Sequence, residues 1–190
     1  MNKLKLQDIL PIKISTVYKE VGNYTCVNLS LYKDVWHIAP YYWRLVDGKI
    51  SLLEIGIDPA TGQFLSLNVV LYNNFIKRKI LDNEQQRSPN EVTGIPTFST
   101  EIWGMTKLEN FRERFYDVHN KFQLAMIGKN LEVVLFNEEI SYQIDFLQQI
   151  NFGFNSSKEL CVVTVNDLSD LEITSLKNYE KLHTANIPAS

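Results

Sequence analysis

The stretch from Leu53 to Val70, LEIGIDPATGQFLSLNVV, decides how the whole chain is interpreted. An apolar segment containing Gly56 leads into a short turn, in which Pro59 fixes φ and Gly62 favours a positive φ. The segment that follows the turn carries apolar residues at every second position. This order of residues predicts an antiparallel β-hairpin with one face buried.

A second stretch has the same order. Ile150 to Asp167, INFGFNSSKELCVVTVND, also passes through a glycine to an Asx residue, crosses a polar turn and enters an apolar strand. Its turn is shorter and has no counterpart of Pro59 or Gly62. We therefore expect two related hairpins that form the framework of two pseudo-repeated halves, rather than duplicated active-site loops, whose polar residues would need to be retained.

Alternation of apolar and polar residues predicts further strands around both hairpins. Asp47-Gly48 is a strong signal for a two-residue hairpin turn, because both residues tolerate positive φ. The expected strands cover residues 10–17, 24–31, 41–46, 49–57, 63–72, 122–127, 131–136, 141–146 and 160–165.

Two capping-box patterns predict helices. Thr106 and Glu109 precede apolar residues at helical spacing, which indicates an amphipathic helix over 106–119. Ser169 and Glu172 begin a second helix that runs to Leu182. The expected fold class is α+β: mostly antiparallel β-sheet in two pseudo-repeated halves with one central and one C-terminal helix.

This pattern divides the chain into three parts. Residues 1–80 form an N-terminal β-meander half, and residues 81–105 form an irregular, polar connection. Residues 106–190 contain the central helix, the second β half and the C-terminal helix. At 190 residues, these parts can share one compact core.

Charge narrows the classes of partner. Residues 1–95 carry 11 Lys/Arg and 9 Asp/Glu, whereas residues 96–190 carry 8 and 13. Nucleic-acid binding requires clustered basic residues, and the cluster at 77–79 is too short to supply them. We expect no nucleic-acid partner, and an acidic second half that complements a basic protein.

The sequence also indicates where in the cell the protein resides and whether its cysteines are reduced. No apolar stretch approaches the roughly 20 residues of a membrane span, and the N-terminus lacks the features of a secretory signal. We expect a cytoplasmic protein without membrane contact. Cys26 and Cys161 lie in apolar runs and are expected to be buried free thiols, since a disulfide would better fit an exported protein.

The sequence shows no recognisable catalytic motif. A Walker loop, GxGxxG, GxSxG, HExxH and paired-cysteine zinc patterns are all missing, and the three histidines are widely spaced. We expect no catalytic residue, no metal and no cofactor. Among the carboxylates we single out Glu54, because it interrupts an apolar run. It therefore lies on a polar face or requires a partner such as Arg44 or Lys49.

Aromatic residues concentrate in the segment 36–43, WHIAPYYW. Alternate residues of this segment can pack into a sheet core. Aromatic side chains also anchor protein interfaces and offer flat faces to sugars. As interface residues we single out Trp36, His37, Tyr42 and Trp43.

The pattern LEIGIDPATGQFLSLNVV, with FGFNSSKELCVVTVNDLSDLE later in the chain, resembles small bacterial immunity proteins of secreted polymorphic toxins. The resemblance spans residues 53–172 and rests on the order of residue types, on the chain length and on the acidic composition. It implies a non-catalytic protein that neutralises a cognate toxin by covering its active site or substrate surface. Glu138, Glu139 and Asp145 would then meet a basic nuclease surface, with the aromatic segment as anchor.

Two other functions stay open. One is an enzyme whose active site is assembled from scattered residues, for which Glu54 and His37 are the residues to test. The other is a β-rich carbohydrate-binding module that uses Trp36, Tyr42 and Trp43. For any of these functions, the chain is expected to be a monomer or a homodimer.

Overall fold

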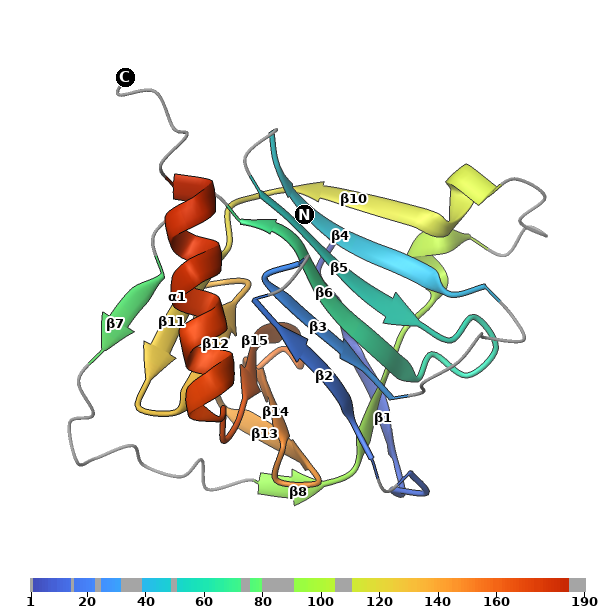
Figure 1. Cartoon of the computed structure of the whole chain (residues 1–190). Coiled ribbons are helices and arrows are strands. Elements are labelled where there is room, and N and C mark those ends of the chain that lie inside the picture. Colours follow the sequence, from blue (N-terminus) through green and yellow to red (C-terminus); the bar gives the residue numbers. More distant parts are fainter. Residues whose placement is uncertain are drawn as a thin grey trace.

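A computed structural model describes residues 2–14, 16–22, 25–31, 39–48, 51–72, 76–79, 91–104 and 111–184. These residues form two large β-sheets that face each other across a shared apolar core, with one α-helix beside them (Figure 1). The described part of the chain is thus mostly β-sheet with a single α-helix. No helix within it is long and apolar enough to cross a membrane.

One sheet has six strands in the order β10-β4-β5-β6-β3-β2. Neighbouring strands are antiparallel except for β10 and β4, which are parallel. The bounds are β2 (Tyr18–Val21), β3 (Val27–Ser30), β4 (Tyr41–Asp47), β5 (Ser51–Ile57), β6 (Phe64–Tyr72) and β10 (Phe115–His119).

The other sheet has seven strands in the order β7-β11-β12-β15-β14-β13-β8. Its two edge strands, β7 and β8, pair in parallel with their neighbours, and the remaining pairs are antiparallel. The bounds are β7 (Lys77–Lys79), β8 (Glu91–Thr93), β11 (Gln123–Ile127), β12 (Asn130–Val134), β13 (Tyr142–Phe146), β14 (Ile150–Phe154) and β15 (Leu160–Val165).

A two-stranded sheet and short helices complete the described structure. β1 (Leu6–Leu10) pairs in antiparallel orientation with β9 (Ile95–Phe98). The remaining elements are the 3-10 helices η1 (Glu101–Trp103) and η2 (Phe111–Arg114) and the helix α1 (Asp170–Thr184).

The two large sheets share one strand order. Five consecutive strands, β2 to β6 in one sheet and β11 to β15 in the other, are arranged as third, fourth, fifth, second, first. Their registers also match, because Gly56 stands opposite Tyr42 and Ser66, and Gly153 stands opposite Gln143 and Val162. A shift of register follows each of these glycines directly.

The turns of the two hairpins β5–β6 and β14–β15 are built alike. Asp58 Oδ1 accepts hydrogen bonds from the backbone N–H groups of Ala60 and Thr61 at 2.8 and 2.9 Å. Asn155 Oδ1 accepts from Ser157 and Glu159 at 3.0 and 2.9 Å. The Asx residue that the two stretches share therefore organises each turn, since such side chains bond to backbone groups just ahead of them.

Each hairpin turn is also bonded to a strand that lies earlier in the sequence than the other set of five, β9 in one case and β1 in the other. The Phe98 N–H of β9 donates to the Gly62 carbonyl at 2.8 Å. On the other side, the Leu6 N–H of β1 donates to the Lys158 carbonyl at 2.8 Å. Because β1 and β9 pair with each other, the two sheets are linked through their leading strands.

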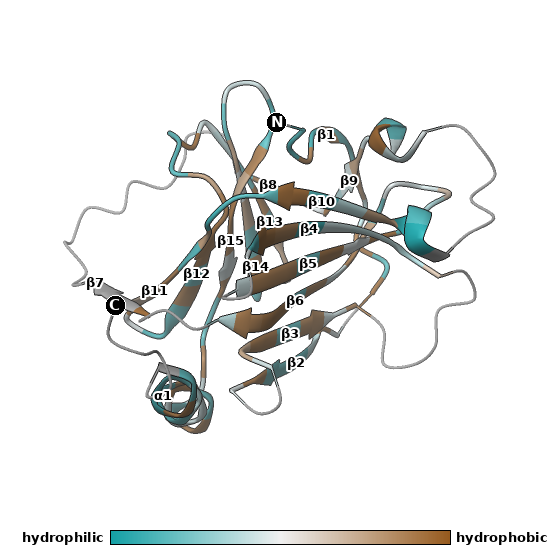
Figure 2. Cartoon of the chain, turned by 90° about the horizontal axis from the view of Figure 1, so that it is seen from above, coloured by the Kyte–Doolittle hydropathy of each residue, from teal (hydrophilic) through white to brown (hydrophobic). Residues whose placement is uncertain are grey.

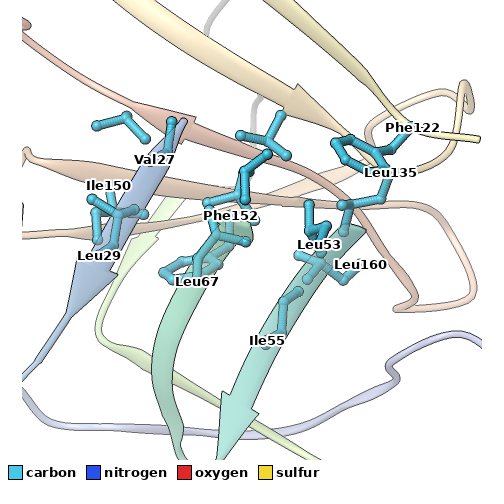
Figure 3. Packing of buried hydrophobic residues seen from close by; sticks show 14 of the residues in the cluster. Val27, Leu29, Leu53, Ile55, Leu67, Phe122, Leu135, Ile150, Phe152 and Leu160 are labelled. Atoms are coloured by element: carbon cyan, nitrogen blue, oxygen red, sulfur yellow. The ribbon is translucent and has the colours of Figure 1, made fainter. Parts of the chain in front are cut away.

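The core lies between the inward faces of the two sheets (Figure 3). Leu53, Ile55 and Leu67 of the six-stranded sheet lie in one cluster with Ile150 and Phe152 of the seven-stranded sheet. The rings of Phe64 and Phe152 meet across the gap with centroids 4.8 Å apart. Apolar residues at alternate positions of β5, β6, β14 and β15 supply much of this core, as the sequence pattern predicts.

Both cysteines are buried and free, which confirms that prediction. Burial, with a smaller contribution from the nearby Glu180 carboxylate, raises the pKa of the Cys26 thiol to about 12. Burial likewise raises the pKa of Cys161 to about 11. Neither thiol is activated as a nucleophile, because nucleophilic cysteines have lowered pKa values.

The C-terminal helix is confirmed. The Ser169 hydroxyl accepts from the Glu172 N–H at 3.2 Å, and the Glu172 carboxylate accepts from the Ser169 N–H at 2.7 Å, which is the predicted capping box. Lys19 of β2 forms an ion pair with Glu172 at 3.1 Å. Tyr179 is buried, and its hydroxyl accepts from the Tyr72 N–H. Figure 2 shows α1 end-on beside the two sheets.

The predicted central helix over 106–119 is wrong where the structure describes it. Residues 105–110, which include the capping box, lie outside the described residues. Phe111–Arg114 form a single 3-10 turn, and Phe115–His119 form strand β10. The apolar spacing fits a helix, but five residue pairs with β4 supply the partner that a strand requires, and tertiary context outweighs local preference.

Two predicted boundaries also change. Residues 81–90 of the expected connection lie outside the described residues, while the part from Glu91 onward contains β8, β9 and η1. The strand expected at 10–17 occurs earlier, as β1. The halves exchange strands, because β10 of the second half joins the sheet of the first and β7 of the first half joins the sheet of the second.

Candidate functional site

The outer face of the seven-stranded sheet holds an open hollow of about 710 Å³. Side chains from strands β8, β11, β12, β13, β14 and β15 and from adjoining turns surround it. The lining residues are Glu91, Thr93, Ile127, Asn130, Glu132, Gln143, Asp145, Gln148, Asn151, Thr164, Asn166 and Asp167.

Strand register explains why polar side chains gather here. Asp145 pairs with Asn151, Asn151 with Thr164, and Thr164 with Glu132, so these residues form one row across four strands. Thr93 extends the row on β8. Since alternate residues of a strand point to opposite faces, the apolar neighbours of these residues enter the core while the polar row faces outward.

The charged side chains among the described lining residues of the hollow are all acidic. Its lining includes the carboxylates of Glu91, Glu132, Asp145 and Asp167 and, among these twelve residues, no Lys, Arg or His. The remaining polar groups are amides and hydroxyls, which can both donate and accept hydrogen bonds. Such a surface favours cationic groups, above all guanidinium groups, which bind carboxylates through paired hydrogen bonds.

The rim of the hollow contains a strained turn. Leu147 and Gln148, between β13 and β14, have φ values of 57° and 58°. The Gln149 N–H donates to the Phe146 carbonyl at 3.1 Å, closing a two-residue hairpin turn. Two-residue turns with positive φ usually contain glycine or asparagine, because other side chains cost roughly 1–2 kcal/mol per residue in this conformation.

Two side chains that line the hollow, Asp145 and Asn166, hold the strained turn in place. Both Asp145 carboxylate oxygens accept from the Gln148 N–H, at 3.0 and 3.1 Å. The Asn166 side-chain amide donates to the Gln148 carbonyl at 3.1 Å. Backbone strain of this kind persists where the surroundings fix the conformation, and it clusters at functional sites.

Of the predicted acidic residues, only Asp145 lines the hollow. Glu138 belongs to a separate ionic cluster, in which its carboxylate binds the Lys3 ammonium and accepts from the Asn155 side-chain amide at 2.5 Å. Lys3 also bonds Glu159 at 3.0 Å. Glu139 is exposed and does not line the hollow. The cluster fastens the N-terminal segment to the turn between β14 and β15.

This ionic cluster predicts a pH dependence of stability. Hydrogen bonds from Lys3 and Asn155 lower the pKa of Glu138, and bonds from Asn155 and Lys3 lower that of Glu159. A carboxyl whose pKa falls on folding stabilises the protein above its usual value of 4.5, and this contribution is lost as the pH drops through the folded pKa. We expect Lys3→Met to flatten the loss of stability below pH 4.5.

The measurement is the free energy of unfolding in urea at neutral pH and in steps below it. Lys129→Met is the matched control, because Lys129 pairs with Asp170 at 3.2 Å where both side chains are largely exposed. Its pH profile should follow that of the unmodified protein. A Lys3→Met profile as steep as that of the control would contradict the assignment.

The predicted aromatic residues do not form one surface. Trp43 is completely buried, and its indole N–H donates to the Asn2 carbonyl at 3.1 Å, so it belongs to the core. Tyr42 is half-buried on the outer face of the six-stranded sheet, where its ring stacks on Phe115. Trp36 and His37 lie outside the described residues.

The predicted pairing of Glu54 with Arg44 is confirmed. The two residues stand opposite each other on β5 and β4, with the guanidinium 3.7 Å from the carboxylate. Arg44 also binds both carboxylate oxygens of Asp117 at 2.6 and 2.8 Å. Burial raises the pKa of Glu54, with Arg44 opposing the rise and Asp117 adding to it. Lys49, the other candidate partner, lies outside the described residues.

Sequence reasoning missed three carboxylates of the hollow, namely Glu91, Glu132 and Asp167. Glu132 alternates with apolar residues in β12, and this pattern could have placed it on the outer face. Glu91 and Asp167 had no such signal. Their approach to Asp145 depends on pairing between strands that are distant in the sequence.

Within the part of the chain that the structure describes, no group of three or more His, Cys, Asp or Glu side chains is placed to hold a metal ion. Comparison with known proteins adds no relative, because no family model and no curated protein matches the sequence. The hollow therefore has to be interpreted from its own chemistry.

Proposed function

We propose that the protein is a non-catalytic binding protein of the immunity type, which neutralises a bacterial toxin by covering a basic surface of it. The observation that carries the proposal is the hollow on the seven-stranded sheet, where four carboxylates and no cation occur among the lining residues. A toxin that acts on nucleic acid needs a basic surface for its substrate, and that surface is complementary to this hollow.

The sheet suits stoichiometric binding. Its strands are fixed by continuous backbone pairing, so the polar rows are already in place before a partner arrives. Pre-organised side chains lose little conformational entropy on binding, which favours affinity. Carboxylates of one sign also speed the encounter with a basic partner and make its rate sensitive to salt.

The binding test is titration of the purified protein against the candidate toxin encoded by the adjacent gene, with protection from toxicity as a second measurement. We expect Glu91→Lys combined with Glu132→Lys to raise Kd by about a hundredfold and to abolish protection, because the lining then carries two lysines beside Asp145 and Asp167 and no longer attracts a basic surface. Neither residue holds the strained turn, so the fold should be retained.

Two single variants serve as controls. Each of Glu101→Lys and Glu139→Lys makes the same change in charge as one of the two substitutions in the hollow, but at an exposed position outside it. They should bind within a few-fold of the unmodified protein. Absence of any complex with the toxin, or equal losses in all variants, would rule out the acidic hollow as the binding surface.

We further propose that the two large sheets descend from one duplicated unit. Support comes from the common order of five strands, from the equal register around Gly56 and Gly153, and from the Asx-organised turns. Identical strand order alone can arise by chance, but a register shift directly after the corresponding glycine in both sheets adds an independent coincidence. The outer faces have since acquired different side chains.

A further inference from the structure

Strand β8 is an exposed edge of the seven-stranded sheet. It consists of Glu91, Val92 and Thr93, and within the described part of the chain it pairs with β13 alone. All three of its residues are exposed. Figure 1 shows β8 at the lower margin of the sheet, with no described strand beyond it. This edge is therefore accessible to a segment of another protein.

The backbone of β8 directs hydrogen-bonding groups away from the sheet. The Gly94 N–H, directly after β8, donates to the Asp145 carbonyl of β13 at 3.0 Å. The backbone groups of successive residues in a strand point to opposite edges, so Val92 faces β13 as Gly94 does. The N–H and C=O groups of Glu91 and Thr93 consequently face outward, and the described residues supply no hydrogen-bond partner for them.

The side chains of β8 differ between the two faces of the sheet. Glu91 and Thr93 line the acidic hollow. Val92 stands opposite the completely buried Ile144 and points to the core side, yet Val92 itself is 41% exposed. A strand added beside β8 would place the side chains opposite Glu91 and Thr93 on the hollow face and the side chain between them beside Val92.

The charge of the hollow selects the residues of such a strand. A basic side chain opposite Glu91 meets its carboxylate directly. Thr93 is small, so a long basic side chain opposite it can extend across β8 toward Asp145, the residue that pairs with Thr93. Asp145 accepts from the Gln148 N–H, and a carboxylate retains further acceptor capacity. The edge thus fits an extended segment in which basic residues flank an apolar one.

The same charge disfavours a second copy of this chain at the edge. Antiparallel pairing of two β8 strands would bring Glu91 and Asp145 of both copies onto one face, where like charges repel. The basic strand β7 lies at the opposite edge of the sheet. Pairing of β7 with β8 of another copy would leave an open edge at each end and extend without closing.

The end of β8 is fixed before any partner arrives. Gly94 is bonded to β13 and packs closely against β1, since a Cβ at Gly94 would lie 2.2 Å from Ile9 Cγ2. An edge that is already ordered loses little conformational entropy on binding. Its three described residues suit a short segment rather than a long strand.

We propose that an extended basic segment of the partner adds to β8 as a further strand of the seven-stranded sheet. Arginine or lysine side chains stand opposite Glu91 and Thr93, and an apolar side chain lies beside Val92. This inference rests on the proposed function for the identity of the partner, the basic toxin that covers the hollow. It adds that backbone pairing at β8 fixes the orientation of the toxin over the hollow.

The first test is hydrogen exchange of backbone amides, measured by NMR in the free protein and in its complex with the toxin encoded by the adjacent gene. Strand addition should slow exchange of the Glu91 and Thr93 amides by about tenfold or more, because each becomes hydrogen-bonded. The Val92 amide already faces β13 and serves as the internal reference. A complex in which the Glu91 and Thr93 amides exchange as in the free protein would overturn the inference and leave the proposed function intact.

Thr93→Pro tests the backbone bond by substitution. Proline removes the outward N–H, and an edge strand tolerates it where that N–H bonds no other strand. We expect Kd for the toxin to rise about tenfold. Thr93→Ala loses the same side chain but keeps the N–H, so it should weaken binding much less. Equal effects of the two variants would contradict strand addition, and unfolding curves establish that each is folded. Amide exchange in the unmodified protein decides the matter should Thr93→Pro prove unstable.

A synthetic probe decides the matter where no complex with the toxin forms, an outcome in which the proposed function fails. The probe is a fluorescent peptide of alternating arginine and valine, and its control carries methyl groups on alternate backbone nitrogens. We expect the first peptide to bind about tenfold more tightly than the second, and Thr93→Pro to remove the difference. Equal binding of both peptides, or of neither, would then overturn the inference. So would self-association in sedimentation that Thr93→Pro abolishes, because it would assign the edge to a second copy.

Discussion

Phe152→Ala should lower the free energy of unfolding by about 3–5 kcal/mol, the usual range for removal of a large buried aromatic ring. Phe152 is completely buried in β14, and its ring meets Phe64 of the opposite sheet at 4.8 Å. The change would open a void in the middle of the contact between the sheets, which strand pairing prevents from closing. The measurement is the unfolding midpoint and slope in guanidinium chloride.

The control for this prediction is Leu171→Ala. Leu171 is a large apolar residue in α1 that is 81% exposed, so its removal should change stability by less than about 0.5 kcal/mol. A small effect of Phe152→Ala, within reach of the control, would mean that the two sheets do not share the core described above.

Gly62→Ala should also lower the free energy of unfolding strongly. Gly62 has a φ of 72°, and a Cβ at this position would lie 2.3 Å from the Phe98 carbonyl oxygen. The left-handed conformation alone costs roughly 1–2 kcal/mol for alanine, and displacement of the β9 backbone adds about 1–3 kcal/mol. Thermal and denaturant unfolding should both report the loss.

Gly48→Ala separates the two causes. Gly48 also has a positive φ, of 55°, but apart from its chain neighbours no atom of the described residues lies within 4 Å of the place that its Cβ would occupy. This variant should show only the conformational cost. Equal destabilisation by the two substitutions would contradict the close approach of β9 to the hairpin turn.

Local signals were sufficient for much of the fold. The alternation in 63–72 and 160–165 identified strands, and the Ser169–Glu172 capping box identified α1, because each depends on neighbours within a few residues. Asp47-Gly48 correctly indicated the hairpin of β4 and β5, but Asp47 itself pairs with Ser51 as the last residue of β4 rather than forming the turn. The shared order of the two hairpin stretches pointed to related turns. Hydrogen bonds of Asp58 and Asn155 now give that likeness a physical basis.

Sequence patterns failed to predict the structure where it depends on residues that are distant in the sequence. Phe115 and Val118 are spaced as on a helix, yet β4 draws this segment into a parallel strand. The same limit applies to the hollow, since Glu91 and Asp145 are brought together only by the pairing of β8 with β13. Trp43 was predicted to lie at an interface because its segment is rich in aromatic residues, but its side chain is buried in the core.

The pairing of β1 with β9, and the bonds of these two strands to the hairpin turns, affect how the chain can fold during synthesis. Residues up to Tyr72 can pair into one sheet early, but the apolar side of that sheet is covered by β14 and β15, which are translated much later. Until then β1 and the first hairpin turn also lack their later partners. Sheets that depend on pairing between distant parts of the chain form slowly, and they expose apolar surface until they are complete. The nascent chain is therefore most vulnerable to misassociation on the ribosome, between completion of its first sheet and emergence of the second.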